Sequence, residues 1–241
     1  MIGALRRRYY SEQYNPGLLG LFINPYFLAR RSLWRAIAST GGRLQGPVLD
    51  VGCGSKPYRA LFKVASYVGL DIDSDLARRR GVADKLYDGN RFPFADGEFQ
   101  GVLCNQVLEH VFQPDAFLEE IRRVLGPGGR LLLTVPFVWD EHEQPFDFAR
   151  YTSFGLQALL VRHGFKVLEQ RKLLSDFSVL AQLTIAYLFK VSRTRIPAVN
   201  LLLAVLLFAP ISVAGLVLAA VLPNNPDLYL DQLVVAEKVD A

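Results

Sequence analysis

The feature that most constrains the fold is an alternation of apolar runs with helical spacing between residues 46 and 175. Apolar runs fill residues 47–52, 67–73, 86–87, 101–106 and 130–137; helical spacing fills residues 58–64, 117–125 and 153–163. Strands that are apolar on both faces need cover on both sides, so repeated strand and helix units predict a doubly wound, mostly parallel α/β sheet. A GPGG sequence at residues 126–129 predicts a turn that ends the preceding helix.

The first predicted strand runs directly into a glycine turn with the sequence VLDVGCGSKPY, residues 48–58. Gly52 and Gly54 let the backbone approach a ligand closely, and Asp71, 21 residues after Asp50, is placed to accept both hydroxyls of a ribose. The third glycine of a dinucleotide-binding turn is missing and Pro57 follows closely, which argues against a pyrophosphate. A tight turn without a ligand remains the alternative.

The chain has two cysteines, Cys53 and Cys104, which excludes a disulfide framework and the usual thiolate metal sites. Cys53 lies between the two glycines and Cys104 in a predicted buried strand, so we expect both to be structural. This cysteine usage fits a reducing, cytosolic setting.

Positive charge is concentrated in the N-terminal arm, residues 1–45. Residues 1–47 hold seven arginines and one acid, Glu12, whereas the whole chain has a formal net charge of +4. Tyrosine, phenylalanine and tryptophan are interleaved with these arginines, a mixture typical of anionic membrane surfaces. We expect a membrane surface rather than nucleic acid as the partner; a solvated helix whose aromatic residues cover the core is the alternative.

A second apolar feature lies near the other end of the chain. Residues 196–226 contain no charged side chain, and residues 201–222 are long enough to cross a hydrocarbon core of about 30 Å. A shorter apolar stretch, residues 177–189, precedes them, and the basic linker KVSRTR separates the two. Composition alone would predict a transmembrane helix.

The ordered motifs resemble those of the class I S-adenosylmethionine-dependent methyltransferases. After Asp50, Gly52, Gly54 and Asp71 come FPFADGEFQGVLCNQVLEHV at residues 92–111 and RVLGPGGRLLLTVP at residues 123–136. The resemblance spans residues 46–167 and is closest to the quinone-biosynthesis and small-molecule subgroup. It implies S-adenosylmethionine as cofactor and a seven-stranded sheet whose last two strands are antiparallel.

The same resemblance assigns the cofactor site residue by residue. It implies that the methionine part of the cofactor lies against Asp50, Gly52 and Gly54. It places the ribose on Asp71, the adenine near Asp88 and Gly89, and the sulfonium over Asn105 and Gln106. A cationic sulfonium and ammonium are favoured near the carboxylate of Asp50.

Candidate catalytic residues follow the fourth and fifth predicted strands, where open α/β sheets place substrate groups. His110 lies in LEHV, and His142, Asp147 and Arg150 lie in EHEQPFDFARYT, which resembles relatives acting on surface glycans and lipids. Purely structural roles for Glu109 and His110, and a surface position for His142, are the alternatives. The acids around His142 could also hold a metal ion, but nothing argues for a phosphate or catecholate, so we expect none.

The apolar insertion must begin and end on the same side of a membrane. Residues 165–174 and 230–239 match the last two strands, so residues 176–226 lie between paired strands and residues 227–241 contain the final one. We therefore predict a re-entrant or in-plane element, broken into two short helices at Pro210 and Gly215. A buried helical pair, a dimer interface and a single span with the last strand misassigned are the alternatives.

We thus expect a methyltransferase domain at residues 46–175, accompanied by the N-terminal arm, the apolar insertion and the segment with the final strand. We expect the protein to be peripheral or monotopic on the cytoplasmic face of the inner membrane. The expected reaction is O-methylation of a lipid or lipid-linked glycan by S-adenosylmethionine. Quinone-type methylation, a soluble small-molecule acceptor in the cytoplasm and a catalytically silent membrane adaptor are the alternatives. The sequence does not predict the oligomeric state.

Overall fold

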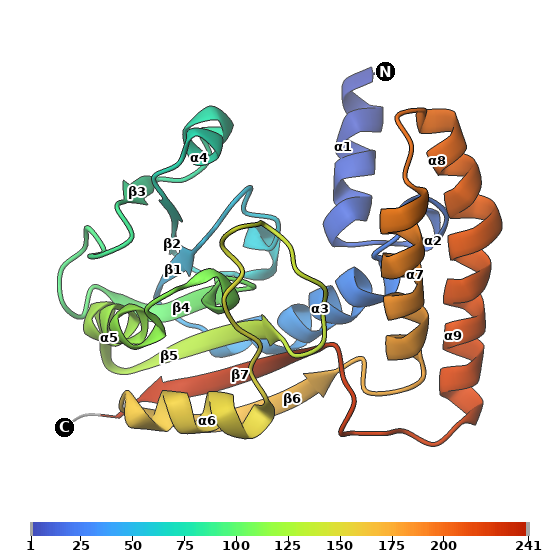
Figure 1. Cartoon of the computed structure of the whole chain (residues 1–241). Coiled ribbons are helices and arrows are strands. Elements are labelled where there is room, and N and C mark those ends of the chain that lie inside the picture. The colour runs from blue at the N-terminus through green and yellow to red at the C-terminus, as the bar shows by residue number, and fades with distance from the viewer. Residues whose placement is uncertain (1, 240–241) are drawn as a thin grey trace. The chain divides into compact units, whose positions relative to one another are not determined.

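The computed structural model describes residues 2–239, with side chains from residue 8 onward (Figure 1). Contacts divide the chain into two compact units, and each draws on both halves of the sequence. One unit is helical and comprises Met1–Ala36 and Lys172–Asp231; the other holds most of the sheet and comprises Ile37–Arg171 and Gln232–Ala241. The predicted N-terminal arm and apolar insertion therefore contribute to the same unit.

Seven strands form one mixed sheet in the order β3-β2-β1-β4-β5-β7-β6, which confirms the predicted fold class. They are β1 Pro47–Val51, β2 Ser66–Ile72, β3 Lys85–Tyr87, β4 Phe99–Asn105, β5 Leu125–Pro136, β6 Phe165–Leu173 and β7 Asp231–Lys238. The first five strands are parallel to one another. The last two are antiparallel, because Leu230 N–H donates to Leu173 O and Val239 N–H donates to Gly164 O.

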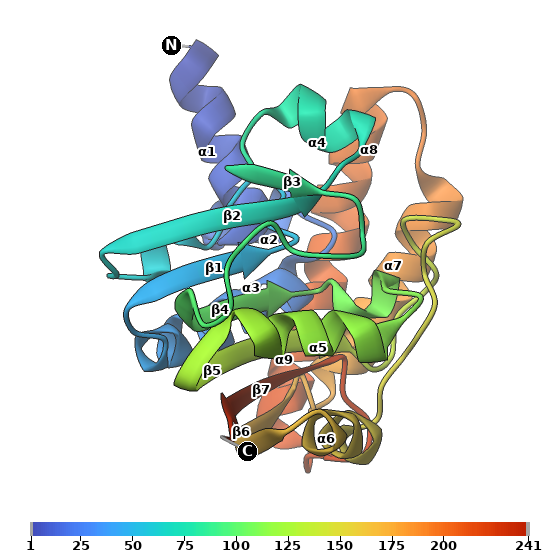
Figure 2. The same ribbon diagram turned by 90° about the vertical axis from the view of Figure 1, so that its left-hand side faces the viewer.

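Helices α5 (Pro114–Val124) and α6 (Ser153–Arg162) pack on the sheet (Figure 2). Helix α5 buries Phe117, Leu118, Ile121 and Val124, the spacing of one helical face, in the main hydrophobic core. Pro114 begins the helix, where a missing N–H costs nothing. The short helix α4 (Asp75–Arg80) follows β2; the Ser74 side chain caps it and Gly81 ends it in a left-handed conformation.

Two local predictions were wrong. The helix expected at residues 58–64 is only a 3₁₀ turn, Arg59–Leu61. Its backbone bonds run from Leu61 N–H to Tyr58 O and from Phe62 N–H to Arg59 O, three residues apart, and Phe62 is already extended, so no α-helical turn forms. The GPGG turn lies inside β5 as an irregularity, since Phe99 pairs with Leu125 but Gly101 pairs with Arg130.

In the helical unit, the N-terminal helices pack against the apolar insertion. Its helices are α1 (Ile2–Tyr14), α2 (Leu18–Ile23), the first part of α3 (Phe27–Thr40), α7 (Ser178–Ser192), α8 (Pro197–Leu203) and α9 (Ala209–Val221). The buried side chain of Gln182 on α7 joins the two: its Oε1 accepts from Ala29 N–H at 3.0 Å and its Nε2 donates to Pro25 O at 2.9 Å. Gly215 on α9 packs so closely on α7 that a Cβ would lie 2.5 Å from Ala181 Cβ.

The predicted break at Pro210 and Gly215 is absent. Helices α8 and α9 are joined through a π-helical turn, Ala204–Phe208, into one helix from Pro197 to Val221. A proline inside a regular α-helix clashes with the carbonyl four residues earlier. Here the π-helical turn ends just before Pro210, which lies in the first turn of α9, where it is tolerated.

Candidate functional site

The predicted cofactor residues meet at the carboxyl ends of the parallel strands. Asp50 and Asp71 are the penultimate residues of β1 and β2, Asp88 directly follows β3, and Asn105 ends β4. Parallel pairing aligns these ends, because Val51 is paired with both Leu70 and Cys104. In open α/β sheets this edge is where ligands bind.

Asp50 is a buried carboxyl group held by a phenol. Its side chain accepts a hydrogen bond from Tyr67 Oη at 2.6 Å, and the residue is only 4% exposed. Burial raises the pKa of Asp50 to about 7, although the bond from Tyr67 and the charge of Lys56 oppose the rise. The motif had not pointed to Tyr67, which lies on the neighbouring strand and is revealed only by the sheet register.

Both glycines of the turn have a left-handed backbone, and Gly52 also has no room for a side chain. Gly52 has a φ of +69°, and a Cβ there would lie 2.3 Å from Val107 Cγ2. Gly54 has a φ of +52°, and its N–H donates to Asp71 Oδ2 at 3.2 Å. The turn and the Asp71 carboxylate are therefore fixed relative to each other.

Asn105 is also oriented by a neighbouring strand. Its Oδ1 accepts from the hydroxyl of the buried Thr134 at 2.8 Å. The next residue, Gln106, has a φ of +55°, and its N–H donates to Thr134 O. Thr134 was not predicted, because a threonine in a buried strand carries no motif signal.

Asp88 is exposed and organises the turn after β3. Its two carboxylate oxygens accept from the backbone and side-chain nitrogens of Asn90 at 2.9 and 3.2 Å. These bonds lower the pKa of Asp88. Gly89 follows with a φ of +92°.

The two predicted catalytic histidines lie side by side, with ring centroids 4.7 Å apart. His110 ends the 3₁₀ turn Leu108–His110 after β4, and His142 lies in the segment after β5. His110 Nδ1 is 2.7 Å from Phe146 O, and His142 Nδ1 is 3.2 Å from Asp140 O. Burial and the neighbouring His110 lower the pKa of His142, so the ring is neutral at pH 7 and can accept a proton.

The carboxylate of Asp147, the third predicted catalytic residue, is hydrogen-bonded to Arg150 and His142. Its carboxylate binds both terminal nitrogens of Arg150 at 2.6 and 2.7 Å and accepts from His142 N–H at 3.0 Å. The Arg150 guanidinium holds the pKa of Asp147 well below its usual range. Such a carboxylate is a weak proton acceptor, so the geometry favours a positioning role for Asp147 on His142.

Exposed aromatic side chains lie beside the histidines. Phe112, two residues after His110, is 75% exposed, and its ring centroid is 5.2 Å from that of Phe148. Phe146, whose carbonyl binds His110, is 62% exposed. The three exposed rings of Phe112, Phe146 and Phe148, which we call the aromatic rim, thus belong to the chain segments that carry His110 and His142.

The residues at this edge fit S-adenosylmethionine. The carboxylate of Asp71 lies beside the glycine turn. A Cβ on Gly54 would have Arg80 Nη1 as its nearest neighbour, at 3.6 Å, so a ligand has room to approach the backbone of Gly54 closely. Asp50 offers a carboxylate to an ammonium group, and Asp71 offers oxygens to ribose hydroxyls. The donor set therefore matches the charge and hydroxyl pattern of this cofactor.

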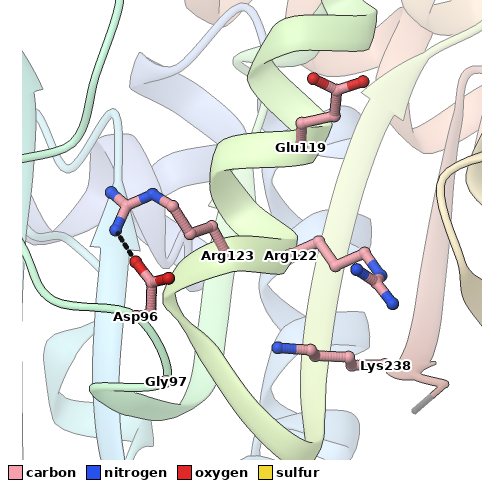
Figure 3. A pocket seen from close by; sticks show the side chains of 6 residues that line it. All are labelled: Asp96, Gly97, Glu119, Arg122, Arg123 and Lys238. Carbon is pink, nitrogen blue, oxygen red and sulfur yellow. Dashed lines mark hydrogen bonds and ion pairs between the residues drawn. The ribbon is translucent and has the colours of Figure 1, made fainter. Parts of the chain in front are cut away.

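A cavity of about 460 Å³ lies elsewhere on the sheet unit (Figure 3). Six residues line it: Asp96, Gly97, Glu119, Arg122, Arg123 and Lys238. They lie just before β4 begins, in the last turns of α5 and at the end of β7, at the amino ends of the parallel strands. Arg123 forms ion pairs there with Asp96 and Glu120. Because the amino ends of the parallel strands are opposite their carboxyl ends, the cavity lies away from the site described above.

Comparison with known proteins agrees with this geometry. Residues 49–133 match the family described as a methyltransferase domain. A fatty-acid O-methyltransferase of Mycolicibacterium smegmatis is 40% identical over 99 residues, which cover 36% of each chain. A ubiquinone/menaquinone biosynthesis C-methyltransferase of Desulfotalea psychrophila is 33% identical over 110 residues, or 40% of this chain and 45% of its own.

The fold is also found among solved structures. An S-adenosylmethionine-dependent methyltransferase from Mesorhizobium loti superposes with a TM-score of 0.55 at 14% identity, covering 88% of this chain and all of its own. The chain spans less than half the length of the curated relatives it matches. Residues 49–133 therefore match a methyltransferase domain, and the chain has the fold of the class I S-adenosylmethionine-dependent methyltransferases.

Proposed function

We propose that this chain transfers a methyl group from S-adenosylmethionine to an oxygen of a membrane-associated lipid or lipid-linked glycan. The observation that carries the proposal is the convergence of Asp50, the glycine turn, Asp71 and Asn105 on one edge of the sheet, with His110 and His142 after the next strands. When bound, S-adenosylmethionine supplies a methyl group attached to a cationic sulfur, and the neutral thioether that remains is a good leaving group. The acceptor oxygen forms a bond to the methyl carbon as the carbon–sulfur bond breaks.

The residues of the chain then have separate tasks. Asp50 and Asp71 hold the donor, while Asn105, fixed by Thr134, borders the predicted place of the reacting centre. Holding the nucleophile in line and close supplies most of the rate enhancement in such a displacement. A hydroxyl acceptor must also lose its proton, and the neutral ring of His142, positioned by Asp147, can take it.

An apolar acceptor is supported by the aromatic rim. Phe112, Phe146 and Phe148 are all exposed, although burying such rings in the core would be favourable. Exposed rings next to a polar site suit a ligand with a hydrocarbon part and a reactive polar end. One relative is a fatty-acid O-methyltransferase, which agrees with an acceptor of this kind.

The helical unit supports docking to a membrane. The helix Pro197–Val221 is long and apolar enough by length and composition to cross a bilayer, and much of its surface is exposed. Leu202, Leu206 and Val217 are 57%, 67% and 56% exposed. The linker before this helix carries three exposed cations, Lys190, Arg193 and Arg195, which suit anionic lipid headgroups.

The geometry of the insertion favours docking without crossing. Its two ends are joined by the hydrogen bond from Leu230 to Leu173, so both lie on the same side of any bilayer. If the helix Pro197–Val221 crossed the membrane, α7 would have to cross it as well. The 15 residues of α7 span only about 22 Å, which is less than the hydrocarbon core of about 30 Å. We therefore propose a peripheral or monotopic position on the cytoplasmic face of the membrane.

The reaction is tested by incubating the full-length protein with S-adenosylmethionine labelled in its methyl group and with either membrane lipids or aqueous metabolites from the same cells. We expect label in the lipid fraction and loss of this label in the Asp71→Ala variant. Label in the aqueous fraction alone would contradict a lipid acceptor. Label in neither fraction, with a folded protein, would contradict the whole proposal.

Docking is tested by sedimentation with phosphatidylcholine vesicles that contain or lack phosphatidylglycerol. The test protein carries Leu206→Glu and Val217→Glu, two exposed positions where a charge leaves the core untouched. A matched control carries Phe154→Glu and Val161→Glu on α6, which are also exposed and apolar. We expect the first variant to bind at least about tenfold more weakly, because each charge opposes entry into the apolar interface. Equal sedimentation of wild type and both variants would refute docking through this helix.

A further inference from the structure

Three side chains that could hold a metal ion meet in the sheet unit. One candidate ligand atom from each of Glu109, His110 and His142 lies within 4.8 Å of the other two. Two of them come from the turn after β4 and the third from the segment after β5. The sequence alone did not predict this group, because the distance from His142 to the other two depends on the path of the segment after β5.

The two imidazoles already have the orientation that a metal ligand needs. Each ring nitrogen Nδ1 faces a backbone carbonyl, that of Phe146 for His110 and that of Asp140 for His142. An Nδ1–H bonded in this way leaves the lone pair of a neutral ring on Nε2. Ligating histidines almost always donate their second nitrogen to such an acceptor. His142 Nδ1 also lies 3.3 Å from Asp147 Oδ2, a carboxylate partner of the same kind.

The carboxylate and the local charge favour a cation. Glu109 is fully buried, and its Oε1 lies 3.8 Å from His110 Nε2. The charge of Arg150 is balanced by its paired bonds to Asp147. The remaining carboxylate, that of the buried Glu109, lies beside the two imidazoles, and burial strengthens the attraction of a carboxylate to a cation.

We propose that Glu109, His110 and His142 bind a divalent metal ion through one carboxylate oxygen and the two Nε2 atoms. Ligand atoms around a tetrahedral Zn²⁺ lie about 3.4 Å apart at bond lengths of about 2.0–2.1 Å. The side chains must therefore approach one another by about an ångström, which rotation of the partly exposed imidazoles can supply. Two histidines and one carboxylate are a known ligand set for zinc and for non-haem iron.

Three protein ligands leave at least one coordination position open. An ion held here could bind an oxygen of the acceptor and lower its pKa, which would promote loss of its proton. Because His142 Nε2 would then be bound to the ion, the ion would replace the His142 ring in the proton-removing role assigned to that ring above. That use of the ion rests on the proposed methyl transfer, whereas binding of the ion does not. The two are therefore tested separately.

The test titrates the full-length protein, without a histidine tag and after treatment with a chelator, with ZnCl₂ in a calorimeter. His110→Gln and His142→Gln are the test variants, and His163→Gln is the control. His163 is the third of the three histidines in the chain, and it is bonded to Asp115 instead. Binding of S-adenosylhomocysteine and circular dichroism show whether each variant keeps its fold.

We expect wild type and the His163→Gln variant to bind about one Zn²⁺ per chain. Replacing an outer partner of a metal ligand costs about 10–100-fold in affinity, so loss of a ligand in His110→Gln or His142→Gln should cost at least tenfold. Absence of saturable binding to wild type, or equal affinity in a folded His142→Gln variant, would overturn the site. Either result can occur with cofactor binding intact, so failure of the metal site is distinct from failure of the methyltransferase proposal.

Discussion

The buried carboxyl group of Asp50 makes a specific prediction about pH and stability. Its pKa is raised from 3.8 to about 7 in the folded protein, chiefly by burial. Between about pH 4 and 7 the folded protein therefore keeps a proton that the unfolded chain releases. Raising the pH through this range favours unfolding. This rise in the pKa of Asp50 corresponds to a loss of about 4 kcal/mol in the free energy of unfolding between pH 4 and 8, from this group alone.

The substitution Asp50→Asn isolates this contribution. Asparagine keeps the size of the side chain, can accept the hydrogen bond from Tyr67 and does not titrate. We expect the variant to match wild type near pH 4 and to exceed its stability by up to about 4 kcal/mol at pH 8. Chemical unfolding of the cofactor-free protein, followed by circular dichroism at several pH values, measures this difference, in which the contributions of all other groups cancel.

A second variant tests the direction of the effect. The Tyr67 hydroxyl bonds to the ionised carboxylate and so opposes the rise in the pKa of Asp50. We expect Tyr67→Phe to move the midpoint of the stability change to higher pH. A stability difference between wild type and Asp50→Asn that does not vary with pH would refute the reasoning.

Three other substitutions test the packing around the site and the insertion. We expect Gly52→Ala to cost about 1–3 kcal/mol in thermal unfolding, from its positive φ and the contact with Val107. Thr134→Val keeps the shape of the side chain but removes the donor to Asn105; it should cost about 1–2 kcal/mol and weaken S-adenosylhomocysteine binding. Gly215→Val should cost about 1–3 kcal/mol by overpacking α9 against α7, while the same titration shows unchanged cofactor binding. Unchanged melting temperatures would contradict the contacts described.

The sequence predicted those parts of the fold that depend on local pattern. The apolar runs located the strands, and two acidic residues about 20 positions apart located the carboxyl edges of β1 and β2. Antiparallel pairing of β6 with β7 was predicted across an insertion of some fifty residues, because both strands keep their own apolar spacing and match the family.

Features that depend on contacts distant in sequence were not predicted. The π-helical turn before Pro210 keeps one helix where local propensity suggests a break. The bond from Tyr67 to Asp50 requires the register of two strands. The meeting of Glu109 with His142 requires the path of the segment after β5. In each case the deciding energy comes from packing in the folded chain and has no signal in the local sequence.

The central claim is that the edge formed by Asp50, the glycine turn and Asp71 binds S-adenosylmethionine. Calorimetric titration of the full-length protein with S-adenosylhomocysteine tests this claim most directly. We expect one molecule bound per chain, with affinity reduced about 10–100-fold in Asp71→Ala, because a hydrogen bond to a charged group contributes about 1.5–3 kcal/mol. A folded wild-type protein that binds none, or equal affinity in Asp71→Ala, would contradict the claim.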